Sequence, residues 1–131
     1  EANMAARLGL GQAIQEALVQ GLDTIQTQVQ SKASKIREAL QRMPHIQSHD
    51  VGTQFSGLIA FTAQDLTSDA VRTHLAQQGI EVAVNGTAFT PLDMRARRLA
   101  NVVRISAHTT TTDAEIARLL DAVSNLSDLT P

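Results

Sequence analysis

The stretch that decides the fold is residues 102–126, VVRISAHTTTTDAEIARLLDAVSNL. An apolar segment with one arginine in its middle is followed by four threonines and then by a helical pattern. Because side chains alternate along a strand, two faces are predicted, one made of Val103, Ile105 and Ala107 and the other of Val102, Arg104 and Ser106. A charge within an apolar strand is costly unless it meets an anion, so Arg104 is the first candidate functional residue.

The segment after the threonines predicts a helix that packs on the core. Thr112 with Glu115 three residues later matches a capping box, which marks a helix start. The apolar positions that follow recur at helical spacing and form one stripe: Ile116, Leu119, Leu120, Val123 and Leu126.

Two further helices are predicted at the start of the chain, over residues 2–20 and 22–42. Gly21 separates them, and Pro44 ends the second. The second carries one apolar stripe, made of Ile25, Val29, Ala33, Ile36, Leu40 and Met43. Its other face, which includes Lys32 and Lys35, is predicted to face solvent.

Short strands and one more helix are predicted between these ends. Strands are expected over residues 46–49, 54–62 and 80–84, and a helix over 66–78 with Thr67 or Ser68 as its N-cap. Residues 85–100 read as a long connection. The order predicts an α+β fold: a small mixed or antiparallel sheet of about four strands with helices on one face.

Composition narrows the function classes. The chain has 131 residues, which suits a single domain, and 43% of them are hydrophobic, as in a globular protein. A net charge of −2 and 2% aromatic residues argue against nucleic-acid binding. No apolar run approaches the length of a membrane helix. The absence of cysteine excludes a thiol nucleophile and a thiolate metal site, and it fits a cytoplasmic protein.

The start of the sequence raises an expectation about its context. The first residue is Glu1, no signal-peptide pattern follows, and the pattern is helical by Ala5. We therefore expect a piece of a longer polypeptide.

Three basic or polar features are candidate sites, each with a plainer alternative. Arg104 either grips a carboxylate or phosphate through paired hydrogen bonds, or forms a structural ion pair or lies on a solvated face. The threonines at 109–112 either bind an anion beside a helix N-terminus or act as a cap and turn. The arginines of the long connection either steer an anion or partner, or belong to a solvated loop; they are Arg95, Arg97 and Arg98.

No metal site is expected. His45 and His49 are four residues apart, but Pro44 disfavours the helix that this spacing requires, and no further ligands lie nearby. The adjacent Ser48, His49 and Asp50 do not predict a catalytic triad, because a triad is a spatial arrangement.

Five stretches, in order, give the chain a family resemblance. They are AARLGLG at 5–11, SGLIAF at 56–61, QGIEVAV at 78–84, LDMRAR at 92–97 and VRISAH at 103–108. In these segments the chain resembles the C-terminal small domain of class V aminotransferases, fold-type I enzymes that use pyridoxal 5′-phosphate (PLP). The resemblance is greatest to the branch that includes cysteine desulfurases and isopenicillin N epimerase-like proteins.

The resemblance implies roles for particular residues. Arg104 matches the small-domain arginine that binds the α-carboxylate of the substrate, and Asn85, His108 and Thr110 are further candidates for substrate contact. Residues 1–21 would form an interdomain helix and residues 22–131 the small domain. The large domain, with the Schiff-base lysine and the phosphate site, is not in this sequence, so no catalytic or cofactor-binding residue is expected here.

Two departures from the family pattern limit the chemistry. Desulfurases carry a catalytic cysteine in the loop that matches residues 85–90, and none stands here, so persulfide transfer at this position is excluded. The family often has Tyr-Asn-Thr before the last helix, where this chain has Thr110, Thr111 and Thr112.

The function expected is therefore that of a domain within a PLP enzyme. It would cover the cofactor cleft, orient an amino-acid substrate and be inactive alone, in a cytoplasmic parent that forms a homodimer. One alternative is a free-standing α+β module that binds a small anion or a protein partner through Arg104 and the arginine loop. A second is a structural dimerisation domain.

Overall fold

The computed structural model describes residues 3–129. Its helices are α1 (Met4–Gln20), α2 (Leu22–Gln41), α3 (Ser68–Gln77), α4 (Pro91–Ala96) and α5 (Asp113–Ser124), followed by the 3₁₀ helix η1 (Asn125–Leu129). Its strands are β1 (Ile46–Ser48), β2 (Leu58–Ala63), β3 (Ala83–Gly86) and β4 (Asn101–Ser106). All neighbouring strands run antiparallel, in the order β1-β2-β4-β3. The predicted α+β class is confirmed.

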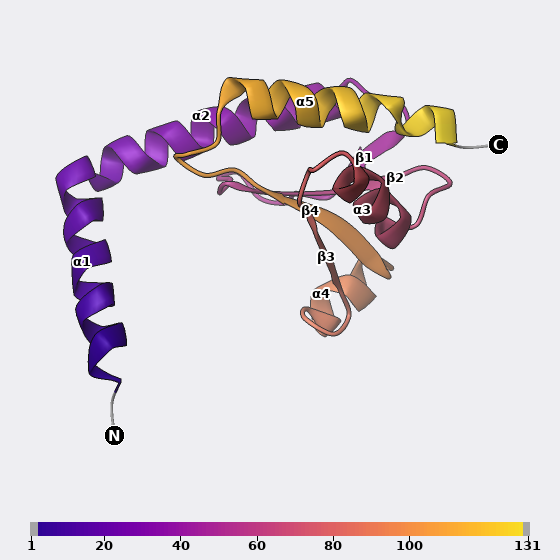
Figure 1. The fold of residues 1–131 in the computed structure, drawn as a ribbon. Coiled ribbons are helices and arrows are strands. Elements are labelled where there is room, and N and C mark those ends of the chain that lie inside the picture. Colours follow the sequence, from indigo (N-terminus) through magenta and orange to yellow (C-terminus); the bar gives the residue numbers. More distant parts are fainter. Residues whose placement is uncertain (1–2, 130–131) are drawn as a thin grey trace.

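One face of the sheet packs against helices and forms the core. Figure 1 shows α2 and α5 side by side over the sheet, with α4 on its other side. The predicted strand face of Val103, Ile105 and Ala107 is buried in this core. Helix α2 contributes Ala33, Ile36 and Leu40, and α5 contributes the following: Ile116, Leu119, Ala122 and Val123.

The start of α5 has the predicted cap. Thr112 Oγ1 accepts from the backbone N–H of Glu115, and Glu115 Oε2 accepts from the N–H of Thr112 at 2.7 Å. The Glu115 carboxylate accepts from both the backbone N–H and the hydroxyl of Thr112, and these two hydrogen bonds lower its pKa. The capping box therefore fixes the point at which the threonine segment becomes helix.

Three of the boundaries predicted from the sequence differ clearly from those in the structure. The second strand begins at Leu58 rather than at 54, and just before it the carbonyl of Ser56 accepts a hydrogen bond from Arg37. The third strand lies at Ala83–Gly86 rather than 80–84, since Ile80 closes the turn after α3 by donating to Leu75 O. The connection 85–100 contains α4, which has Pro91 in its first turn.

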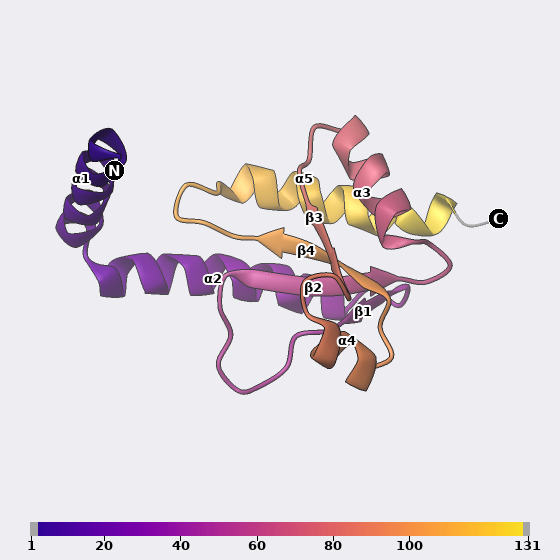
Figure 2. The same ribbon diagram turned by 90° about the horizontal axis from the view of Figure 1, so that it is seen from below.

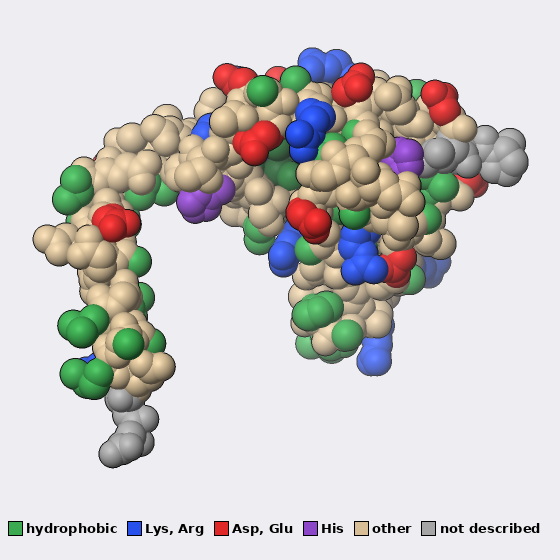
Figure 3. All heavy atoms as spheres, viewed as in Figure 1, with side chains coloured by type: hydrophobic (Ala, Val, Ile, Leu, Met, Phe, Trp, Pro, Cys, Tyr) green, Lys and Arg blue, Asp and Glu red, His purple; other side chains and the backbone are tan. Residues whose placement is uncertain are grey.

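Helix α1 projects away from the rest of the chain (Figures 1 and 2). Gly21, with φ 88°, takes the left-handed backbone that breaks it from α2, as the sequence predicted. No residue of α1 is buried within the described part of the chain. Its large apolar side chains are exposed: Met4, Leu8, Leu10, Ile14, Leu18 and Val19. Figure 3 shows green hydrophobic side chains along this helix.

Candidate functional site

Arg104 lies in the middle of β4, on the sheet face opposite the helical core. In the strand register it stands between Ala60 of β2 and Ala83 of β3. Because side chains at paired positions share a face, both cross-strand neighbours of Arg104 on this face are alanines. The small neighbours leave space around the arginine.

Arg104 pairs with no acidic side chain among residues 3–129. Its side chain makes no ion pair or hydrogen bond with any of residues 3–129, and its Nε is buried without a partner. The structural ion pair that the sequence left open is therefore ruled out for the described chain. A buried N–H without a partner costs about 1–3 kcal/mol, so an acceptor from outside residues 3–129 would stabilise Arg104.

Arg104 lines a hollow of about 190 Å³ beside β2 and β4. Its wall combines side chains from the sheet, from α4 and from the segment after β1. The polar and charged ones are His49, Asp50, Asn85, Thr90, Asp93, Arg97 and Arg104. Of the four residues expected to contact substrate, the structure brings Arg104 and Asn85 to this hollow.

The other two candidates lie elsewhere. Thr110 lines a second hollow of about 230 Å³, bounded by α5 and the turn after α3. His108 is exposed and lines neither hollow; its Nδ1 lies 3.4 Å from Thr110 Oγ1. Both follow the end of β4, so the structure does not gather all four candidates in one place. Their substrate contacts stay predictions.

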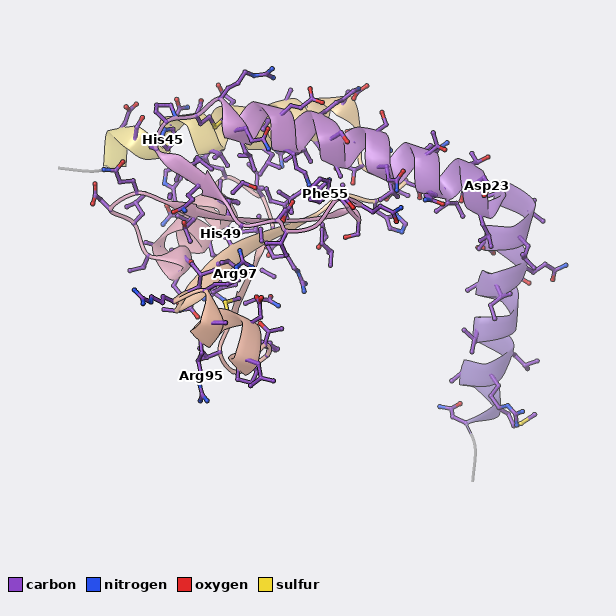
Figure 4. All side chains as sticks on the ribbon, turned by 180° about the vertical axis from the view of Figure 1, so that it is seen from behind. Asp23, His45, His49, Phe55, Arg95 and Arg97 are labelled. Carbon is purple, nitrogen blue, oxygen red and sulfur yellow. The ribbon has the colours of Figure 1, made fainter. Side chains whose placement is uncertain are left out.

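The three arginines of the 85–100 connection do not form one cationic patch. Arg97 points into the molecule, where its Nη1 pairs with Asp93 at 3.2 Å and its Nη2 donates to His49 O at 2.6 Å. Figure 4 shows Arg97 directed toward His49 and Arg95 directed away from the sheet. Arg98 is exposed at a left-handed turn with φ 55°. Arg97 therefore acts in internal structure, contrary to the solvated-loop and patch interpretations alike.

A buried ion pair that the sequence analysis missed adjoins the hollow. Arg37 of α2 pairs with Asp50 through Nε and Oδ2 at 2.5 Å, and its Nη2 donates to Ser56 O and Leu58 O, each at 2.7 Å. Its guanidinium also lies 4.8 Å from the centre of the Phe55 ring. The polar face of α2 was predicted to be solvated, which is wrong at Arg37. The available signal was its spacing, four residues after Ala33 and three before Leu40, on the buried stripe.

The two lysines of α2 contact the threonine segment. Lys32 Nζ donates to Thr109 O at 2.5 Å and to His108 O at 3.3 Å, and Lys35 pairs with Asp113 at 2.9 Å. The fully solvated position predicted for them is therefore incomplete. Because Lys32 donates to backbone carbonyls at the start of this segment, the contact supports a structural role for residues 109–112.

The two histidines bind different partners. His45 Nε2 donates to Val123 O at 3.0 Å, whereas His49 Nε2 is hydrogen-bonded to Thr62 Oγ1 at 2.8 Å. Burial and the nearby Arg97 lower the pKa of His49, with Asp50 opposing them.

Within residues 3–129 no group of three or more His, Asp or Glu side chains is placed to hold a metal ion. None of the described helices is both long and apolar enough to span a bilayer.

The fold and the hollow define an α+β domain that presents an unpaired arginine on the sheet face opposite the helical core. The class V aminotransferase family model matches residues 1–119, and the chain belongs to that family. No curated protein matches the sequence.

Many solved structures share the fold, and three of them show the likeness. The cysteine desulfurase CsdA from Escherichia coli superposes with a TM-score of 0.90 at 22% identity, over 100% of this chain and 32% of that one. A cysteine desulfurase from Thermococcus onnurineus NA1 gives a TM-score of 0.77 at 20% identity, over 83% and 27%. The cystine C–S lyase C-DES, solved with glycine covalently linked to its PLP cofactor, gives 0.61 at 20%, over 76% and 23%. The chain thus spans about a third or less of the length of each.

Proposed function

We propose that this chain is the C-terminal small domain of a PLP-dependent enzyme of class V, and that it orients an amino-acid substrate through the carboxylate that Arg104 binds. The observation that carries the proposal is the buried Nε of Arg104, which has no partner within residues 3–129. A guanidinium in this state supplies a fixed donor pair for a planar carboxylate. Asn85, in the same hollow, is a second polar group for the substrate.

The residues of this chain do not themselves fit PLP. A Schiff base requires a free lysine, and the sequence holds only Lys32 and Lys35. Both amines are engaged by the segment 108–113, away from the Arg104 hollow. The proposal therefore assigns the cofactor to residues outside this sequence and assigns to this domain the covering of the cleft and the orientation of the substrate. The domain alone should be inactive.

Helix α1 supports an interdomain role. Its apolar side chains are exposed throughout, which is unfavourable for a free helix and favourable for one that packs on a further domain. We propose residues 1–21 as the interdomain helix and residues 22–131 as the small domain. The parent enzyme is proposed to be cytoplasmic and a homodimer.

The experiment expresses the polypeptide whose gene encodes this sequence, with all of its upstream reading frame. We expect it to bind PLP through a lysine outside these residues, trapped by borohydride reduction. Amino acids are then screened by the change in cofactor absorbance. Arg104→Gln should weaken binding of the responding amino acid by about 10- to 100-fold, the cost of hydrogen bonds to a charged group.

The result that would overturn the proposal is lysine-dependent, reducible binding of PLP to the 131-residue chain alone. A reading frame that starts at or just before Met4 would instead favour the free-standing module. That alternative has lost one of its proposed cations, because Arg97 is bonded inside the chain to Asp93 and His49.

A further inference from the structure

The Arg104 hollow contains two carboxylates of its own. Asp50 and Asp93 both line it together with Arg104. A carboxylate near a half-buried guanidinium is its natural partner, because paired charges offset the cost of burial. Neither aspartate pairs with Arg104. Another interaction must hold each one.

Asp50 is held at both oxygens. Its Oδ2 accepts from Arg37 Nε at 2.5 Å, and its Oδ1 accepts from the backbone N–H of Ala60 at 2.8 Å. The side chain of Asp50 is 12% exposed and that of Arg37 is 8% exposed. Ala60 is also the strand partner of Arg104, so Asp50 is bonded to the residue that pairs with Arg104 in the sheet.

Asp93 is held by an arginine that is itself anchored. Arg97 Nη1 pairs with Asp93 Oδ2 at 3.2 Å, one turn along α4. Its Nη2 donates to His49 O at 2.6 Å, which ties α4 to the segment after β1. One terminal nitrogen of the guanidinium thus bonds to a backbone carbonyl, and the other bonds to Asp93.

We propose that Arg37 and Arg97 are positioning residues that hold Asp50 and Asp93 away from Arg104 and so keep it available for one substrate carboxylate. The negative charges of the two aspartates are offset by the positive charges of the two arginines that pair with them. Among the aspartates and arginines of this hollow and their partners, Arg104 alone keeps an uncompensated charge. The functional part of this inference rests on the proposed function, whereas the unpaired state of Arg104 is measured without any substrate.

The test follows the Nε–H signal of Arg104 by NMR in the full chain labelled with ¹⁵N-arginine, assigned by its loss in Arg104→Lys. In the wild type this proton should exchange as an unpaired group. In Arg97→Met the released Asp93 should pair with Arg104, shift the signal and slow exchange at least about tenfold, the effect of one charge-assisted hydrogen bond. The double variant Arg97→Met/Asp93→Asn should return the signal to its wild-type state.

The double variant controls for the structural effect of losing Arg97, because the hydrogen bond to His49 O is lost in both variants. Only the single variant leaves an Asp93 carboxylate that can pair with Arg104. An unchanged Arg104 signal in Arg97→Met, or a shift that Asp93→Asn does not reverse, would overturn the inference. Asp50 gives a second measurement through Arg37→Met and Arg37→Met/Asp50→Asn. The proposed function fails separately, when Arg104→Gln leaves binding of the amino acid by the PLP-bound polypeptide unchanged.

Discussion

The guanidinium of Arg37 and the carboxylate of Asp50 form an ion pair, Nε to Oδ2 at 2.5 Å, that is almost completely withdrawn from solvent. The pair links α2 to the segment that follows β1. The same segment lines the Arg104 hollow, so the pair joins the helical layer to the candidate site.

Removing one partner of this pair should destabilise the fold strongly. Arg37→Met removes the partner of the buried Asp50 and the donor to the carbonyls of Ser56 and Leu58, and we expect a loss of about 3–5 kcal/mol in the free energy of unfolding. Urea denaturation followed by circular dichroism measures it. The matched control is Lys35→Met on the same helix, whose exposed pair with Asp113 should contribute little. Equal losses for the two variants would contradict the structural role of the Arg37 pair.

The core could be predicted from the sequence because its signals are local. Alternation gave the buried face of Val103 and Ile105, and 3.6-residue spacing gave the stripes of α2 and α5. The cap at Thr112 follows from two residue types at fixed spacing. The start of β2 did not follow, because residues 54–57 continue the apolar pattern but Ser56 O bonds to Arg37, 19 residues away in the chain.

The candidate site was predictable only in part, for the same reason. Arg104 stands out as a charge inside an apolar strand, and the strand pattern places it on the correct face. The pair of Arg97 with Asp93 follows from their spacing of four once α4 is a helix, but the sequence predicted a connection there. The bond of Arg97 to His49 depends on how α4 folds back, which no local pattern reports. His108 and Thr110 came from family resemblance, and the structure separates them from the hollow.

Gly57 should not tolerate a side chain. A Cβ there would lie 2.5 Å from Val29 Cγ1 and 2.7 Å from Ala107 O, and that backbone oxygen cannot move without disturbing the end of β4. We expect Gly57→Ala to cost about 1–3 kcal/mol, as overpacking does. Thermal unfolding measures the loss. Gly9→Ala, which meets no atom within 4 Å, is the control and should increase helicity. Matching stability for wild type and Gly57→Ala would argue against this packing.

The cap of α5 gives a prediction within the threonine segment. Thr112→Ala removes the hydroxyl that accepts from Glu115 N, and should cost about 0.5–2 kcal/mol in the free energy of unfolding. Thr110→Ala is matched in size and chemistry but caps nothing, so its stability should stay near that of the wild type. Chemical denaturation of the two variants compares them directly. A larger loss for Thr110→Ala would place the structural threonine elsewhere.

His49 should make the stability of the chain depend on pH. Burial, helped by Arg97, lowers its pKa from the ordinary value of 6.5, so the unfolded chain takes up the proton at a higher pH than the folded chain. Its contribution is fully present above pH 6.5 and is lost as the pH falls from that value toward the lowered pKa of the folded chain. Urea midpoints across this range should fall less for His49→Gln than for the wild type. His74→Gln, on α3, is the control; a wild-type slope in His49→Gln would contradict the assignment.

The role of Arg104 is decided by one comparison. For the PLP-bound polypeptide, dissociation constants are measured for the amino acid that changes the cofactor absorbance and for its carboxamide. We expect the wild type to prefer the carboxylate by about tenfold or more, since a charge-assisted pair is lost with the amide. Arg104→Gln should weaken binding of the acid and bring it close to that of the amide. An undiminished preference for the carboxylate in Arg104→Gln would contradict the proposal that Arg104 binds it.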